Sequence, residues 1–239
     1  MSRLSTIAFD ADDTLWHNET IFQFTQSKLA GLLAEFADPD HIDERLLAAE
    51  RRNIHHYGFG VKGFVLSMIE TAIEVTDHRV PAGIIQEILE SGQAMLNHPV
   101  ELLPGVDDVL MALKDRFRLI IITKGDLFDQ ERKVAQSGID HLFDAVEVVS
   151  DKQAATYEKL FAQHGRGASQ GLMVGNSLKS DIIPALDAGA FAVHVPYHVT
   201  FALEHAALPE HSSRFAAITH LAELLPLIER IEVFGESHG

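Results

Sequence analysis

The sequence predicts an α/β fold that has a parallel sheet as its core and a helical bundle inserted into it. Three observations lead to this prediction. Short apolar runs of strand length recur along the chain, helix-like segments separate them, and one long stretch, residues 19–97, contains only the helical pattern. Strands that alternate with helices favour a parallel sheet with right-handed crossovers, so the alternating part is expected to be a layered domain.

The expected strands begin with residues 5–9, directly before the first acidic cluster of the chain. Residues 118–123, RLIIIT, contain a continuous apolar run, which is typical of a strand covered on both faces. Further strands are expected at residues 145–150, 171–176, 191–195 and 215–219.

The helices of the core follow from the spacing of apolar residues. Val106, Val109, Leu110 and Leu113 recur at helical intervals, which predicts a helix over 106–116. Together with the strands, such helices would complete a Rossmann-like core. The same reasoning predicts core helices at residues 127–137, 154–164, 181–188 and 221–231.

The inserted region has no convincing strand and is expected to form a bundle of about four helices. We therefore predict two domains: residues 1–16 with 100–239 form the α/β core, and residues 17–99 form a helical cap. The last residues, 235–239, are expected to fray. The helices of the insert are expected at residues 20–36, 41–56, 62–75 and 82–96.

Composition excludes several classes of function. The formal net charge is −16, which disfavours nucleic acid and anionic membranes as partners. No apolar stretch approaches the roughly 20 residues that a transmembrane helix needs, so we expect no membrane span. The chain has no cysteine, which excludes disulfides and thiolate metal sites and fits a cytoplasmic location best.

Acidic residues follow the first expected strand at once. Asp10, Asp12 and Asp13 lie within four positions, and alternation along an extended chain would point Asp10 and Asp12 in the same direction. Two close carboxylates repel each other, so one can act as an acid while the other stays ionised, and Mg²⁺ prefers such oxygen ligands. For this stretch alone, a turn in which Asp13 or Thr14 caps a helix is the alternative.

The next two strand ends carry groups suited to a phosphate. Thr123, Lys124 and Gly125 come just before a helix, where a hydroxyl and the helix N-terminal amides can donate to phosphate oxygens. Lys152 follows the third strand and could balance charge in a phosphoryl transition state. Taken singly, an ordinary helix cap and a solvated lysine are the simpler explanations.

The fourth strand is followed by GNSLKSD, residues 175–181. Asp181 could complete a metal site begun by Asp10, although it could also cap the following helix. Ligands of open parallel sheets bind beyond the carboxyl ends of the strands. An acid pair, a threonine, a lysine and a further acid at consecutive strand ends therefore indicate one shared site.

This pattern resembles the haloacid dehalogenase-like (HAD) superfamily, in the subclass with a helical cap inserted after the first motif. DADDT, residues 10–14, is similar to the DxDxT motif of that family, and IITKGD, residues 121–126, to its hydrophobic-threonine motif. Lys152 is similar to the third-motif lysine, and GNSLKSDIIPALDAGA, residues 175–190, to the last acidic motif. The likeness covers nearly the whole chain.

The resemblance implies a role for each site residue. Asp10 would be the nucleophile that forms an aspartyl-phosphate, and it would also bind Mg²⁺. Asp12 would protonate the leaving alcohol and then deprotonate the hydrolytic water, with its backbone carbonyl on the metal ion. Thr123 would hold the phosphoryl oxygens. Lys152 would neutralise Asp10 and the phosphoryl group, and Asp181 would bind the metal ion.

Two residues depart from the family pattern. Asn176 stands where the family usually has an acid; its side-chain oxygen can still serve the metal ion, but one negative charge is lost. Lys124 stands where the family often has asparagine, and it would add a positive charge near the phosphate or reach the cap. The expected Mg²⁺ ligands are Asp10, Asp12, Asn176 and Asp181.

Asp12 favours one reaction over the others. An alkoxide leaves poorly without a proton, so an acid two residues after the nucleophile favours hydrolysis of a phosphomonoester, with a small phosphorylated metabolite as substrate. A 2-haloacid dehalogenase, whose halide needs no acid, is the first alternative. A non-catalytic binding protein on the same fold is the second.

The insert offers a candidate substrate contact in NIHHYGFGVKGF, residues 53–64. His56, Tyr57 and Lys62 lie among three glycines that permit close approach, and we expect Tyr57 and Lys62 to bind substrate. A helix–helix turn whose aromatic residues only pack is the alternative, slightly favoured interpretation. Further substrate contacts are expected from Thr123, Lys124 and Gly125.

The chain has 14 histidines, but their spacing does not indicate a zinc site. The natural substrate is not identified by the sequence. The oligomeric state also stays open, with a homodimer as a common outcome for such chains.

Overall fold

The computed structural model describes residues 4–209 and 212–233, which divide into two compact units. The expected frayed tail, 235–239, lies outside the described residues. The core unit comprises Met1–His17, Val100–Thr123 and Arg132–Gly239, and the helical unit comprises Asn18–Pro99 with Lys124–Glu131.

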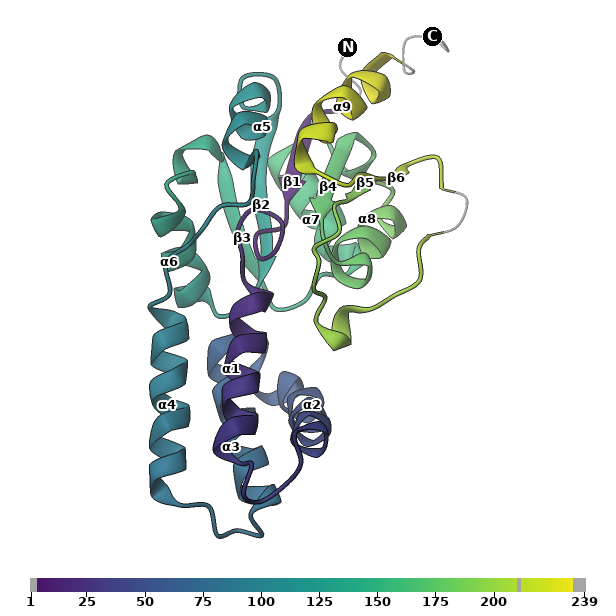
Figure 1. Ribbon diagram of the computed structural model, residues 1–239. Helices are drawn as coiled ribbons and strands as arrows, with labels where there is room; N and C mark the ends of the chain where they lie inside the picture. The colour runs from purple at the N-terminus through teal and green to yellow at the C-terminus, as the bar shows by residue number, and fades with distance from the viewer. Residues whose placement is uncertain (1–3, 210–211, 234–239) are drawn as a thin grey trace. The chain divides into compact units, whose positions relative to one another are not determined.

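The core unit contains a six-stranded sheet in the order β3-β2-β1-β4-β5-β6 (Figure 1). The pairs β1–β2, β1–β4, β4–β5 and β5–β6 are all parallel. Every predicted strand is present within two residues of its expected bounds, so the predicted α/β fold is confirmed. The strands are β1 (Thr6–Phe9), β2 (Arg118–Lys124), β3 (Ala145–Val149), β4 (Gly171–Gly175), β5 (Phe191–His194) and β6 (Phe215–Ala217).

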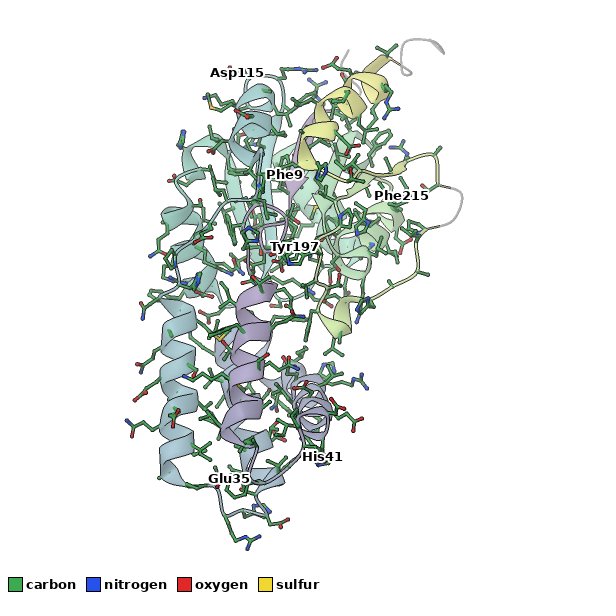
Figure 2. The ribbon with its side chains drawn as sticks, viewed as in Figure 1. Phe9, Glu35, His41, Asp115, Tyr197 and Phe215 are labelled. Carbon is green, nitrogen blue, oxygen red and sulfur yellow. The ribbon has the colours of Figure 1, made fainter. Side chains whose placement is uncertain are left out.

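Successive residues of the central strand face opposite layers of helices. Phe9 packs with Leu110 in one apolar cluster, and Ala8 packs with Tyr157 in the other. Phe9 accordingly lies in the interior of its unit (Figure 2). This two-sided burial explains the continuous apolar runs of the strands. The helices of the first cluster are α5 (Val106–Leu113), the second half of α6 (Leu127–Ser137) and α9 (Leu224–Val233), and those of the second are α7 (Ala154–His164) and α8 (Ile183–Asp187).

The register of the central strands determines which loops share an edge. Phe9 of β1 lies opposite Ile121 of β2 and Val174 of β4. The residues that follow these three therefore emerge at the same edge of the sheet. Short 3₁₀ turns lie at Asp140–Leu142, Ala168–Gln170, Ala202–Glu204 and Leu221–Glu223.

The helical unit has the four helices that were predicted for the insert. Leu29, Leu46, Met68 and Ile88, one from each helix, belong to its apolar core. The turn expected between the helices at 41–56 and 62–75 is present within one residue of its predicted bounds, since only residues 58–60 separate the two helices, and the glycines at both its ends have positive φ. The helices are α1 (Glu19–Leu32), α2 (Pro39–Tyr57), α3 (Val61–Val75) and α4 (Ala82–Leu96).

Across the described part of the chain, no helix combines the length and the apolar character that crossing a membrane requires.

Candidate active site

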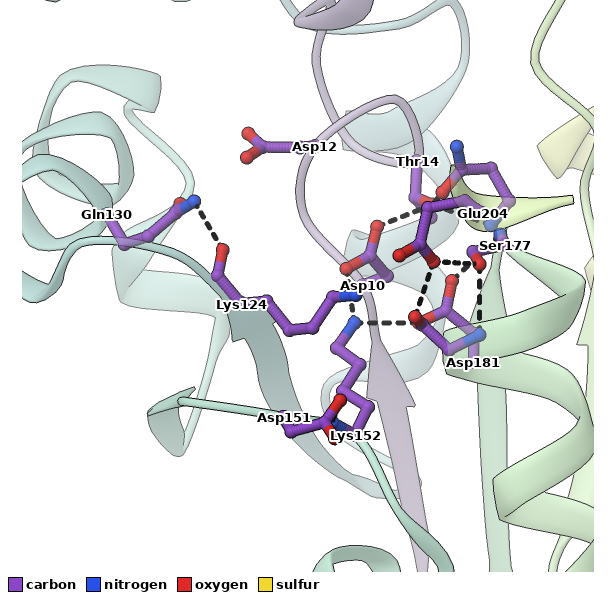
Figure 3. A network of polar contacts seen from close by, with 12 residues as sticks. Asp10, Asp12, Thr14, Lys124, Gln130, Asp151, Lys152, Ser177, Asp181 and Glu204 are labelled. Atoms are coloured by element: carbon purple, nitrogen blue, oxygen red, sulfur yellow. Dashed lines mark hydrogen bonds and ion pairs between the residues drawn. The ribbon is translucent and has the colours of Figure 1, made fainter. Parts of the chain in front are cut away.

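Asp10 lies at the carboxyl end of β1, in the middle of the sheet. Its N–H donates to the carbonyl of Val174 in β4 at 2.9 Å, one residue beyond the strand. Lys152, which follows β3 and is only 3% exposed, donates from Nζ to Oδ1 of Asp10 and, at 2.7 Å, to Oδ1 of Asp181 (Figure 3). One buried lysine thus joins two carboxylates that come from different strand ends.

Burial sets the electrostatics of this triad. Burial raises the pKa of Asp10 to about 7, repulsion from Asp181 adds to the rise, and the attraction of Lys152 opposes it. Burial alone would lower the pKa of Lys152, but attraction to the two carboxylates raises it above its ordinary value. Lys152 is therefore charged at neutral pH, and a further cation would help to keep Asp10 ionised.

The local backbone aims Asp181 at this point. Residues Leu178–Ile182 form a wide helical turn in which the N–H of Ile182 donates to the carbonyl of Ser177 at 3.2 Å. Such i→i+5 turns are rare and frequent at functional sites. The N–H of Ser177 donates to Oδ2 of Asp181 at 2.9 Å. A Cβ at Gly175 would lie 2.3 Å from the same Oδ2, so the glycine makes room for the carboxylate.

Thr14 connects Asn176 to Asp10. The N–H of Asn176 donates to Oγ1 of Thr14 at 3.1 Å. That hydroxyl lies 3.2 Å from Oδ2 of Asp10 and 3.4 Å from Oδ1 of Asn176. The side-chain oxygen of Asn176 is therefore close to Asp10, as the sequence predicts.

The donor set fits a magnesium ion. The carboxylates of Asp10 and Asp181 both accept hydrogen bonds from Lys152. The amide oxygen of Asn176 and the carboxylate of Asp10 both contact the hydroxyl of Thr14. All are hard oxygen donors, and Mg²⁺ needs only one or two carboxylates because it keeps several waters. Within residues 4–209 and 212–233, no group of three or more His, Cys, Asp or Glu side chains is placed to hold a metal ion. The three donors are oxygens, whereas zinc sites typically contain nitrogen or sulfur donors.

Asp12 has a different set of partners from Asp10. Both of its carboxylate oxygens accept from Nζ of Lys133, at 2.6 and 2.8 Å, and Oδ1 also accepts from the indole N–H of Trp16 at 2.7 Å. Its carboxylate points away from Asp10 (Figure 3). The charge of Asp12 nevertheless contributes to the raised pKa of Asp10, so the two acids lie close together, and the chain turns directly after them at Asp13, whose φ is +65°.

Thr123 is buried at the end of β2. By register it follows Ile121, the partner of Phe9, so it emerges at the same edge of the sheet as Asp10. The structure thus brings the acids, the threonine and the lysine of the predicted core site to one edge.

The other predicted substrate contacts belong to the helical unit. Nζ of Lys124 lies 3.9 Å from the ring centroid of Phe59, and Nζ of Lys62 donates to Oδ2 of Asp126 at 2.9 Å. The contact with Lys62 lowers the pKa of Asp126. The segment after β2 and the start of α3 therefore pack together.

Tyr57 and Gly125 are placed differently within the same unit. Tyr57 ends α2 and is 55% exposed, with its ring 6.2 Å from that of His56. Gly125 has φ +140°, and a Cβ there would meet the side chain of Gln130 at 2.8 Å. Only glycine fits the backbone conformation and the close contact at position 125. Tyr57, in contrast, is an aromatic side chain that is accessible to solvent.

Sequence reasoning missed three residues of the core site: Lys133, Trp16 and Glu204. Lys133 and Trp16 hold Asp12, while Glu204 accepts from Oγ of Ser177 at 2.6 Å and from Oγ of Ser180. Glu204 lies far along the chain from the motifs, so only its tertiary placement reveals it. Lys133 had a detectable sign, because it shares the inward stripe of α6 with Val134. A lysine on such a stripe is seldom buried without a partner.

Comparison with known proteins extends these observations. Residues 4–189 match the family model of haloacid dehalogenase-like hydrolases. A haloacid dehalogenase-like hydrolase of known structure from Xanthomonas campestris is 34% identical and superposes with a TM-score of 0.86 over 98% of both chains.

Two further proteins share parts of this likeness. A glyceraldehyde 3-phosphate phosphatase from Methanothermobacter thermautotrophicus is 32% identical over 104 residues, which are 41% of this chain and 46% of that protein. The match thus spans less than half of that relative's length. A 2-haloacid dehalogenase from Pseudomonas syringae pv. tomato is 20% identical, with a TM-score of 0.61 over 95% of this chain and 99% of that one, which shows the fold alone.

The family model covers most of the chain. The chain therefore belongs to the haloacid dehalogenase-like hydrolase family.

Proposed function

We propose that this enzyme is a magnesium-dependent phosphomonoester hydrolase that acts on a small phosphorylated metabolite through an aspartyl-phosphate on Asp10. The observation that carries the proposal is a nucleophilic carboxylate held by a buried lysine, with a second acid two residues later. The phosphatase from Methanothermobacter thermautotrophicus, similar over part of its length, supports the same reaction.

In the first step, a carboxylate oxygen of Asp10 attacks the phosphorus atom, and the bond from phosphorus to the ester oxygen breaks. The leaving alkoxide takes a proton from Asp12, which becomes a carboxylate. In the second step, Asp12 takes a proton from water as that water attacks the phosphorus. The acyl phosphate bond breaks, inorganic phosphate leaves, and Asp10 and Asp12 return to their starting states.

Lys152 supports both steps electrostatically. Its ammonium is fixed on Asp10, so it can balance charge on the phosphoryl group without moving. Asp10, Asp181, Asn176 and the carbonyl of Asp12 would hold the magnesium ion. When bound, the ion would supply further positive charge to stabilise the phosphoryl group.

We assign substrate selection to the helical unit, which acts as the cap, with residues 17–99 as its predicted extent. Tyr57 and Lys62 are its candidate contacts, and Thr123, Lys124 and Gly125 are the candidate contacts after β2. The carboxylate–lysine arrangement also suits a 2-haloacid dehalogenase, in which Asp10 would displace halide. Asp12 favours the phosphatase, because displacement of halide needs no acid.

The proposal is tested by phosphate release from p-nitrophenyl phosphate with Mg²⁺. Asp10→Asn should abolish turnover. Asp12→Asn should release about one nitrophenolate per enzyme and then stall, because this leaving group needs no acid whereas hydrolysis needs a base. A phosphorylated peptide containing Asp10 should then be detected by mass spectrometry.

The matched control is Asp115→Asn, which changes an exposed carboxylate before β2 and should leave turnover unchanged. Turnover that survives Asp10→Asn would refute the nucleophile. Chloride release from 2-chloropropionate in EDTA, with no phosphate release, would favour the dehalogenase.

A further inference from the structure

We propose that Lys133 is a positioning residue that holds the Asp12 carboxylate in place for both proton transfers, an inference that rests on the proposed function. Lys133 lies in α6 and is 9% exposed, and its ammonium contacts both oxygens of Asp12. Burial of a charged lysine is unfavourable unless a close polar or charged partner compensates for the lost hydration. Here one such partner is Asp12, the proposed acid of the reaction.

The contacts restrict the orientation of the carboxylate. Oδ1 of Asp12 accepts from Lys133 and from the indole of Trp16, and Oδ2 accepts from Lys133 again. The indole cannot move easily, because Trp16 is fully buried in the apolar core. Donors on two sides leave the carboxylate little freedom to rotate. Such fixation matters because a displacement of about 1 Å can cost about 10²-fold in rate.

The charge of Lys133 also suits this place. Asp10 and Asp12 are two residues apart and both acidic, and a phosphate ester brings further negative charge. Lys152 is engaged with Asp10 and Asp181, whereas Lys133 contacts Asp12. Each of the two aspartates that act in the reaction therefore has its own ammonium group.

Two other roles for Lys133 predict different behaviour. A lysine that bound the substrate phosphate directly would mainly change KM. A lysine that only stabilised the fold would change the melting temperature and leave the kinetics of the folded enzyme intact. A lysine that acts through Asp12 should change the proton-transfer steps in the way that loss of Asp12 does.

The test compares Lys133→Met with wild type on two esters in Mg²⁺. With ethyl phosphate, kcat should fall about 10²-fold with KM within about threefold, because the alkoxide needs the acid. With p-nitrophenyl phosphate, the first step needs no acid, so only hydrolysis slows. The ratio of the initial burst rate to the steady-state rate should therefore rise at least about tenfold.

A double variant shows whether Lys133 acts through Asp12. Asp12→Asn with Lys133→Met should be no slower than Asp12→Asn alone, since a positioning residue has nothing left to position. Lys133→Arg should restore most of kcat, because arginine keeps the charge and the donors. Lys159→Met, which removes an exposed lysine of α7, is the matched control and should behave as wild type.

Several outcomes would overturn the inference. They are unchanged kinetics in Lys133→Met, a rise in KM with no new burst, or a double variant whose losses multiply. If Lys133→Met does not fold, Lys133→Gln and Lys133→Arg decide the matter by the same burst and double-variant measurements. A wild-type enzyme without phosphatase activity would overturn the proposed function and this inference together. An active wild-type enzyme whose kinetics do not change in Lys133→Met would overturn only the inference.

Discussion

The active-site edge contains two contacts between a lysine and an aspartate, and they differ in depth. The ammonium of Lys152 lies between Asp10 and Asp181, and the side chain of Asp10 is 10% exposed. The ammonium of Lys133 contacts Asp12, whose side chain is 22% exposed. The deeper contact suits the proposed nucleophile, which must be shielded from water, and the shallower one suits the proposed acid and base, which exchanges protons with substrate and water.

Loss of the deeper contact should have the largest effect. Lys152→Met leaves two buried carboxylates without their shared ammonium, so phosphate release should fall by about 10³-fold or more. The free energy of unfolding in EDTA should fall by about 3 kcal/mol, as for other broken buried ion pairs. Turnover of p-nitrophenyl phosphate and chemical denaturation measure the two quantities.

Lys159→Met serves again as the control for removal of a lysine. An activity of Lys152→Met within tenfold of wild type would show that the shared lysine is dispensable, and the proposed distinction between the two contacts would then fail.

The response to magnesium should also distinguish the two contacts. The pKa of Asp10 is raised from 3.8 to about 7, so the folded protein binds its proton more tightly than the unfolded chain does. In EDTA, the stabilisation from this group is present below about pH 4 and is lost as the pH rises through about 7. Mg²⁺ needs the ionised carboxylate, so the increase in melting temperature on adding Mg²⁺ should be small at pH 5 and large at pH 8.

Scanning calorimetry from pH 5 to pH 8, with Mg²⁺ or EDTA, measures this response. Asp10→Asn should remove most of the pH dependence, whereas Lys133→Met should retain it because, in the proposed site, Asp12 would offer the metal ion only its backbone carbonyl. An equal effect of Mg²⁺ at both pH values would contradict the placement of the ion on Asp10.

The two lysines also differ in how well their contacts could be predicted from the sequence. Lys152 and Asp181 could be predicted, because each follows an apolar strand at a spacing that parallel strands turn into proximity. The burial of Lys133 could be expected from its place on the inward stripe of α6, but its contact with Asp12 could not, because that contact depends on how α6 packs against the loop after β1, which is a tertiary property.

The elements of the fold likewise differ in how closely they could be predicted. The six strands were predicted closely, and the central strands β1, β2 and β4 most clearly, since strands buried on both faces are marked by apolar runs. The expected helix at 181–188 instead begins with the wide turn Leu178–Ile182, because Asp181 bonds back to Ser177. In the helical unit, helices were expected at 41–56 and 62–75, and the turn between them was predicted within one residue, since α2 ends at Tyr57 and α3 begins at Val61.

Trp16→Phe should have the smallest effect. Phenylalanine keeps an aromatic ring in the core but removes one of the donors to Asp12, while Lys133 still contacts both oxygens. A hydrogen bond to a charged group contributes about 1.5 kcal/mol, so kcat for ethyl phosphate should fall about tenfold at most, less than in Lys133→Met. The effect of Mg²⁺ on the melting temperature should be unchanged.

Fluorescence checks the geometry behind this order. Trp16 is the only tryptophan of the chain and donates directly to Asp12, so its emission reports on that carboxylate. Lys133→Met should shift the emission toward that of Asp12→Asn, whereas Lys152→Met should leave it near that of wild type. A kcat in Trp16→Phe as low as in Lys133→Met would mean that the indole, not the ammonium, sets the orientation of Asp12, and the roles of the two donors would have to be exchanged.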